Sequence, residues 1–191
     1  EGEAEEGGEE EEEEQEEEDK EESGPAYTRA KAALRAALPP IYEPYREAAK
    51  TKSPFEAKVS RAYFHVKPLD SEQRENWSNY LTAAIERGDE REAKEVAERG
   101  IIATNLYAEL WTQYARWREA AGDSDGARKV LERGIAGPFK RRPELKSQLA
   151  LLEEGLGNLD AARTRYQELV AAAPDSVDVA LRQVNFERRV A

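Results

Sequence analysis

Apolar residues recur at helical spacing through most of the chain after residue 70. Trp77, Tyr80, Leu81, Ala84 and Ile85 follow the series i, i+3, i+4, i+7 and i+8. This spacing puts the apolar side chains on one stripe of an amphipathic helix. Two further stripes follow the same series, and they begin at positions 93 and 127. The pattern predicts an all-α fold built from short amphipathic helices.

The stripes belong to a repeat of 34 residues. Trp77 recurs as Trp111 and Gly88 recurs as Gly122. A third copy follows at an offset of 35, but Lys146 replaces its Trp. Such self-similarity is typical of stacked helical hairpins, which bury their apolar faces against neighbouring repeats. We expect repeats at about 71–104, 105–138 and 139–174, with a partial repeat at 175–191. The predicted core residues are Trp77, Tyr80, Ala93, Trp111, Tyr114, Ala127, Ala162 and Tyr166.

Residues 25–70 precede the repeats and have a different pattern. A helix over residues 27–38 should end at Pro39 and Pro40, because proline lacks a donor and restricts the residue before it. A second helix is expected over residues 43–50, and a third begins with Ser53 as its N-cap and Pro54 in its first turn. The aromatic and β-branched residues 63–69 predict an extended segment that lies across the first repeat.

Charge divides the chain into two parts. Residues 1–22 contain 16 Asp and Glu and a single Lys, so the net charge of -12 arises in this tail and the remainder is slightly basic. Like charges repel, and the tail has almost nothing apolar to bury, so residues 1–24 are expected to be disordered. The tail is interpreted as a solvated spacer, with docking to a basic partner as the alternative. Because the sequence does not begin with Met, we expect a piece of a longer chain.

Candidate chemistry is sparse. The chain has no Cys, its single His is His65, and it contains no Gly-rich phosphate loop, so the sequence predicts a non-enzymatic protein without a metal or cofactor. No stretch is apolar enough for a membrane span. Trp117 lies off the main stripe and is a candidate interface residue. The basic run Lys140, Arg141 and Arg142 is interpreted as solvated loop charge, with RNA phosphate or an acidic protein segment as the alternative ligand.

Local motifs narrow the class of repeat. In the first two repeats the first helix of the hairpin (helix A) carries Trp-x-x-Tyr. The second helix (helix B) of the second repeat carries Ala-Arg-x-Val-Leu-Glu-Arg at residues 127–133, and the two motifs together resemble the half-a-tetratricopeptide (HAT) pattern. The block Tyr-Phe-His-Val-Lys-Pro-Leu at residues 63–69, together with Leu-Tyr-Ala-Glu-Leu-Trp-Thr-Gln-Tyr-Ala at residues 106–115, resembles the pre-mRNA-processing factor 39 family over about residues 53–191. Ala62 departs from the family, which usually has Pro there, and residues 1–22 have no counterpart in it.

The resemblance implies a non-catalytic scaffold for pre-mRNA splicing in the nucleus. Its implied partners are proteins of the U1 small nuclear ribonucleoprotein (U1 snRNP), which recognises the 5′ splice site. It also implies a homodimer, or a heterodimer with a HAT-repeat paralogue. Two other functions stay open on the residues themselves: a generic tetratricopeptide-like peptide adaptor, and a helical repeat protein that binds RNA phosphate.

Overall fold

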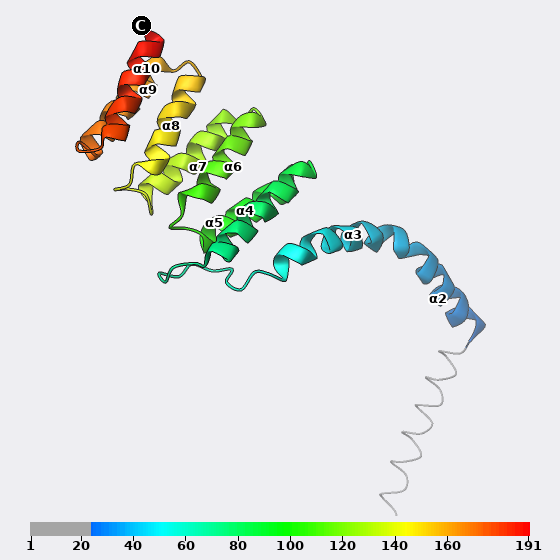
Figure 1. The fold of residues 1–191 in the computed structure, drawn as a ribbon. Helices are drawn as coiled ribbons and strands as arrows, with labels where there is room; N and C mark the ends of the chain where they lie inside the picture. The colour runs from blue at the N-terminus through cyan, green and yellow to red at the C-terminus, as the bar shows by residue number, and fades with distance from the viewer. Residues whose placement is uncertain (1–23) are drawn as a thin grey trace, which may run out of the picture. The chain divides into compact units, whose positions relative to one another are not determined.

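The computed structural model describes residues 24–191, and every regular element in this range is an α-helix (Figure 1). The predicted all-α class is therefore confirmed. The expected disorder of the acidic tail concerns residues that lie almost wholly outside the described range. The chain divides into two units, residues 1–54 and residues 55–191.

The described part of the first unit consists of two helices that bury none of their side chains. These helices are α2 (Pro25–Ala37) and α3 (Pro39–Glu56). The last two residues of α3 belong to the second unit. The predicted break at Pro39 is present. The prediction of two separate helices after this break is wrong, because α3 runs continuously through Pro44 and Pro54. Each of these prolines removes only one backbone donor, and the ion pairs Glu43–Arg46 and Glu47–Lys50 support the turns between them.

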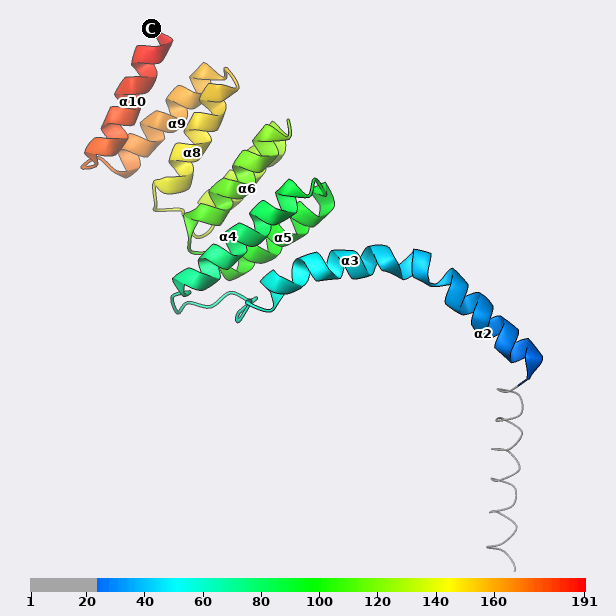
Figure 2. The ribbon, with the colours of Figure 1, turned by 45° about the vertical axis from the view of Figure 1, so that its right-hand side comes forward.

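Three helical hairpins and one further helix form the second unit. Their bounds are α4 (Ser71–Glu86) and α5 (Glu90–Ala103), α6 (Ala108–Ala120) and α7 (Ser124–Ala136), α8 (Glu144–Gly155) and α9 (Leu159–Ala172), and α10 (Val177–Val190). Figure 2 shows the hairpins stacked side by side. A single helical hairpin cannot cover its own apolar face, so the stacking is what buries the core.

Glycine and aspartate make the sharp turn inside each of the first two hairpins. Gly88 and Gly122 have φ angles of 76° and 83°, a conformation that costs little without a Cβ atom. Asp89 accepts a hydrogen bond from the backbone N–H of Glu92 at 3.0 Å, and Asp123 caps α7 in the same way. The third hairpin turns at Gly157, where φ is 76°, but its N-cap residue makes no side-chain capping bond.

The segment 57–70 is held at its two ends and is exposed in the middle. Gln73 accepts a hydrogen bond from Ser60 N–H and donates one to the carbonyl oxygen of Lys58, while Leu69 is buried. Tyr63, Phe64 and Val66, in contrast, are 61%, 44% and 75% exposed. The prediction that this aromatic segment lies across the first repeat is therefore wrong for its central residues.

Candidate interaction surfaces of the repeat unit

The predicted core residues all lie inside the repeat unit. Trp77, Tyr80 and Ala93 come together between α4 and α5, and each is at most 1% exposed. Trp111, Tyr114 and Ala127 fill the corresponding position between α6 and α7, while Ala162 and Tyr166 belong to a smaller cluster with Phe186 of α10. These aromatic side chains have no free faces, so they cannot form a base-stacking platform.

Two glycines in the B helices allow this close packing, and the sequence interpretation overlooked their role. A Cβ atom at Gly100 would lie 2.5 Å from Leu110 and 3.1 Å from the Trp77 ring. Gly134 has an equivalent position against Leu145 and the Trp111 ring. The indole ring and the leucine of the next A helix therefore both occupy the space that a side chain would need. The recurrence of Gly at an offset of 34 could have indicated this requirement.

Buried tyrosines and ion pairs connect successive elements. Tyr80 donates a hydrogen bond to Glu56 at 2.9 Å, and Arg99 binds both oxygens of the same carboxylate. Burial, with the Glu56 carboxylate adding to it, raises the pKa of Tyr80 to about 12. Tyr166 repeats this arrangement with Glu154, and its pKa is also raised to about 12. These phenols stay neutral and act as structural donors.

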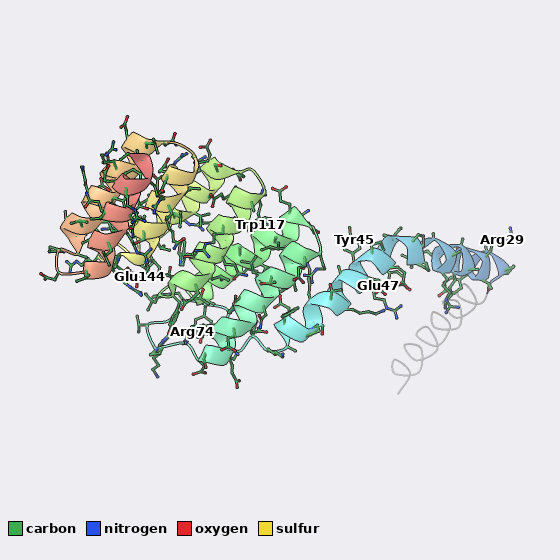
Figure 3. The ribbon with its side chains drawn as sticks, turned by 45° about the horizontal axis from the view of Figure 1, so that its top comes forward. Arg29, Tyr45, Glu47, Arg74, Trp117 and Glu144 are labelled. Carbon is green, nitrogen blue, oxygen red and sulfur yellow. The ribbon has the colours of Figure 1, made fainter. Side chains whose placement is uncertain are left out.

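The candidate interface residue Trp117 is only half-buried. Its ring stacks on Tyr114 with centroids 6.0 Å apart and an interplanar angle of 18°. Figure 3 shows its position on α6. One face of the indole is therefore used by the core, and only the remainder of the ring is open to a partner.

The basic run of the α7–α8 connection is not uniform. Lys140 and Arg141 are exposed to solvent. Arg142 instead donates a hydrogen bond to the Leu106 carbonyl oxygen at 2.8 Å and forms an ion pair with Glu144. Its guanidinium also lies over the ring of Phe139, which is fully buried and meets Trp111 edge-on. Phe139 thus anchors the connection, a role that the sequence interpretation did not assign.

A groove lies along α6 and is bordered by Ser78 of α4 and by Glu144 at the start of α8. It encloses about 600 Å³, and its lining includes Tyr107, Gln113, Arg116 and Glu144. Gln113 joins α6 to α4 by donating hydrogen bonds to the Ser78 carbonyl oxygen at 3.1 Å and to the Thr82 hydroxyl at 2.9 Å. Arg116 is exposed, and its side chain donates to Gln148 of α8. The groove provides hydrogen-bonding groups for a protein segment.

Between residues 24 and 191 no group of three His, Cys, Asp or Glu side chains is placed to hold a metal ion. Within the same range no helix is long and apolar enough to cross a membrane.

Comparison with known proteins agrees with these features. Residues 50–189 match the family described as PRP39 C-terminal HAT repeat. Pre-mRNA-processing factor 39 of Schizosaccharomyces pombe is 36% identical over 137 residues, which are 71% of this chain and 22% of that protein. The Homo sapiens protein of the same name is 35% identical over 135 residues, 71% of this chain and 20% of that protein. The chain thus spans about a fifth of the length of the curated relatives it matches.

Solved structures of tetratricopeptide (TPR) proteins are also similar. One is a thermophilic TPR protein of Thermus thermophilus, with 23% identity and a TM-score of 0.45 over 61% of this chain and 72% of that one. Another is the first TPR domain of Spaghetti (RPAP3) bound to an HSP90 peptide, with 15% identity and a TM-score of 0.44 over 64% and 96% of the two chains. The family match covers all three hairpins and α10. This chain belongs to the PRP39 C-terminal HAT repeat family.

Proposed function

We propose that this repeat unit is a non-catalytic scaffold that holds proteins together during pre-mRNA splicing, in or next to the U1 snRNP at the 5′ splice site. The observation that carries the proposal is the family match over residues 50–189, together with relatives named pre-mRNA-processing factor 39. A role in splicing requires the protein to work in the nucleus. The partners of this chain are accordingly U1 snRNP proteins.

The packing of the unit is suited to scaffolding. Ion pairs between neighbouring repeats, such as Arg133–Glu98 and Arg128–Glu153, hold successive hairpins in register. Such a stack presents side chains on a fixed surface, so binding loses little conformational entropy. The groove along α6, with Arg116 at its surface, is the position where we expect a protein segment to bind.

A pull-down from nuclear extract tests the scaffold. The immobilised chain should enrich U1 RNA over U2 RNA, and Arg116→Glu should reduce the enrichment because it reverses a charge in the groove. Lys129→Glu makes the same charge change at an exposed site on α7 and should have no effect. Equal recovery of U1 and U2 RNA by the unmodified chain would reject the proposal, and equal losses in both variants would reject the groove as the binding surface.

Self-association is the second part of the proposal. The outer face of α10 exposes Val177, Leu181 and Val184 to 72%, 54% and 62%, a stripe at helical spacing. A second copy, or a HAT-repeat paralogue, would cover such a stripe. Light scattering should give twice the 21.5 kDa mass of the chain, and Leu181→Asp should return it to 21.5 kDa. A monomeric unmodified chain at high micromolar concentration would reject the homodimer.

A further inference from the structure

Unpaired positive charge gathers on one part of the repeat unit. Most Arg side chains of the helices form ion pairs, as Arg99, Arg128 and Arg163 do. The connections 57–70 and 137–143 differ, because four of their cations are exposed and have no ion-pair partner among residues 24–191. These cations are Lys58, Lys67, Lys140 and Arg141.

Two hydrogen bonds place the two connections at one edge of the stack. The Leu69 backbone N–H donates to the Tyr107 hydroxyl at 2.9 Å, which joins the first connection to the loop before α6. Arg142 donates to the Leu106 carbonyl oxygen at 2.8 Å, which joins that loop to the second connection. Figures 1 and 2 show these connections on the same side of the hairpins. We call residues 57–70 and 137–143 together the connection edge.

Two aromatic rings are exposed within this basic surface. Tyr63 and Phe64 are 61% and 44% exposed. The turn that presents them is held by hydrogen bonds on both sides: Arg61 donates to the Lys67 carbonyl oxygen at 3.2 Å, and the Lys67 N–H donates to His65 Nδ1 at 2.9 Å. The other aromatic residues of the unit are buried or half-buried, so this degree of exposure is a local feature of the connection edge.

We infer that the connection edge binds single-stranded RNA. The four free cations would contact phosphates, and the rings of Tyr63 and Phe64 would stack on bases. Single-stranded RNA supplies both requirements together, because each nucleotide brings one negative charge and one flat ring. The edge carries six Lys and Arg against one carboxylate, Asp70, whereas the whole chain has a net charge of -12. That negative charge arises in residues 1–22, and the rest of the chain has only a slight positive excess, so attraction for RNA is concentrated at the connection edge.

This RNA contact goes beyond protein scaffolding and is separable from it. Its proposed phosphate contacts, Lys58, Lys67, Lys140 and Arg141, lie outside the groove lining and α10, although Arg142 of the same edge borders the groove. We expect binding without base readout, because stacking on Tyr63 and Phe64 would use the flat face that every base has. Stacking tolerates every base.

Fluorescence polarisation with a labelled 12-nucleotide single-stranded RNA of mixed sequence tests the inference on the full chain. Lys140→Ala with Arg141→Ala removes two phosphate contacts. It should lower the slope of log affinity against log salt by about 1.4 and the affinity by roughly tenfold at 0.15 M salt. Tyr63→Ala with Phe64→Ala should leave this slope unchanged and reduce affinity about 5- to 150-fold for each stacked base lost.

Controls distinguish the outcomes. Lys129→Ala with Arg188→Ala removes two exposed, unpaired cations from other elements and should leave RNA affinity unchanged. All variants should keep the thermal midpoint of the unmodified chain, since the altered side chains are exposed. Absence of RNA binding at 0.05 M salt overturns the inference, and so does an equal loss in the control. Binding of a Glu-rich peptide, but not RNA, at the same residues also overturns it and assigns the edge to an acidic protein.

Discussion

Replacing Trp111 with Ala should destabilise the repeat unit more than any other single aromatic truncation in its second hairpin. The ring is 3% exposed and meets Phe139 at a centroid distance of 6.4 Å. Its Nε1 donates to the Asn105 carbonyl oxygen at 3.3 Å, and the Arg133 guanidinium lies 5.3 Å from the ring. Truncation removes these contacts and leaves a cavity between α6 and α7, so we expect a loss of about 3–5 kcal/mol in the free energy of unfolding.

The size of this effect can be checked against a neighbouring ring. Trp117 is half-buried, so Trp117→Ala should cost only about 1–2 kcal/mol. Urea unfolding followed by circular dichroism at 222 nm measures both variants without relying on Trp fluorescence. Thermal midpoints should fall by roughly 6–20 °C for Trp111→Ala, given about 2–4 °C per kcal/mol at this chain length.

Stacked repeats can also unfold in parts, so the location of the damage matters. Amide exchange in Trp111→Ala should accelerate most in α6 and α7 and least in α10, which belongs to a separate apolar cluster. A loss below 1 kcal/mol, or a Trp117→Ala loss as large as that of Trp111→Ala, would show that the indole at position 111 is not a central part of the core. Uniform acceleration along the chain would refute the local nature of the effect.

Packing and the shifted pKa values lead to three further predictions. Gly134→Ala should lower the free energy of unfolding by about 1–3 kcal/mol in urea titration, because its methyl group would collide with the buried Leu145. The hydrogen bond from Arg128 lowers the pKa of Glu153, so the ionised carboxylate stabilises the fold above its unfolded pKa and this stabilisation is lost as pH falls. Glu153→Gln should therefore make the free energy of unfolding less dependent on pH in the acid range. The pKa of Tyr80 is raised, so its contribution to the free energy of unfolding is present below pH 10 and is lost as pH rises through about 12. Absorbance at 295 nm, which measures tyrosinate, should therefore show late tyrosine ionisation that coincides with unfolding.

The repeat period was the most informative part of the sequence. Trp77 and Trp111 predicted the two hairpins because a helix with an apolar stripe must bury it against neighbours. Gly88 and Gly122 predicted the turns because a left-handed residue is needed there, and both have positive φ. These inferences depend on local conformation and on periodicity, which a single sequence contains.

Contacts between residues far apart in the sequence could not be predicted from periodicity and local conformation. Phe139 is buried because Trp111 and Arg142 close over it, and nothing in the sequence around Pro138 indicates those neighbours. The sequence also did not predict that Tyr63 and Phe64 are exposed, because a run of aromatic residues is usually interpreted as buried. Only the hydrogen bonds that turn the segment at its two ends show why its centre points outward.

The arrangement of ion pairs explains why a repeat stack of this kind keeps free charge for binding in only a few places. Arg99 and Arg133 each lie against an indole ring and pair with a carboxylate of a preceding element, so their charges are used to join repeats. Lys140 and Arg141 have no such ion-pair partner among residues 24–191, and both lie on a connection rather than on a helix. Glu98→Ala should remove the ion-pair partner of Arg133 without creating a binding surface, because the Arg133 guanidinium stays over the Trp111 ring. RNA affinity should be unchanged in this variant, which would show that an unpaired cation must lie at the connection edge to bind RNA.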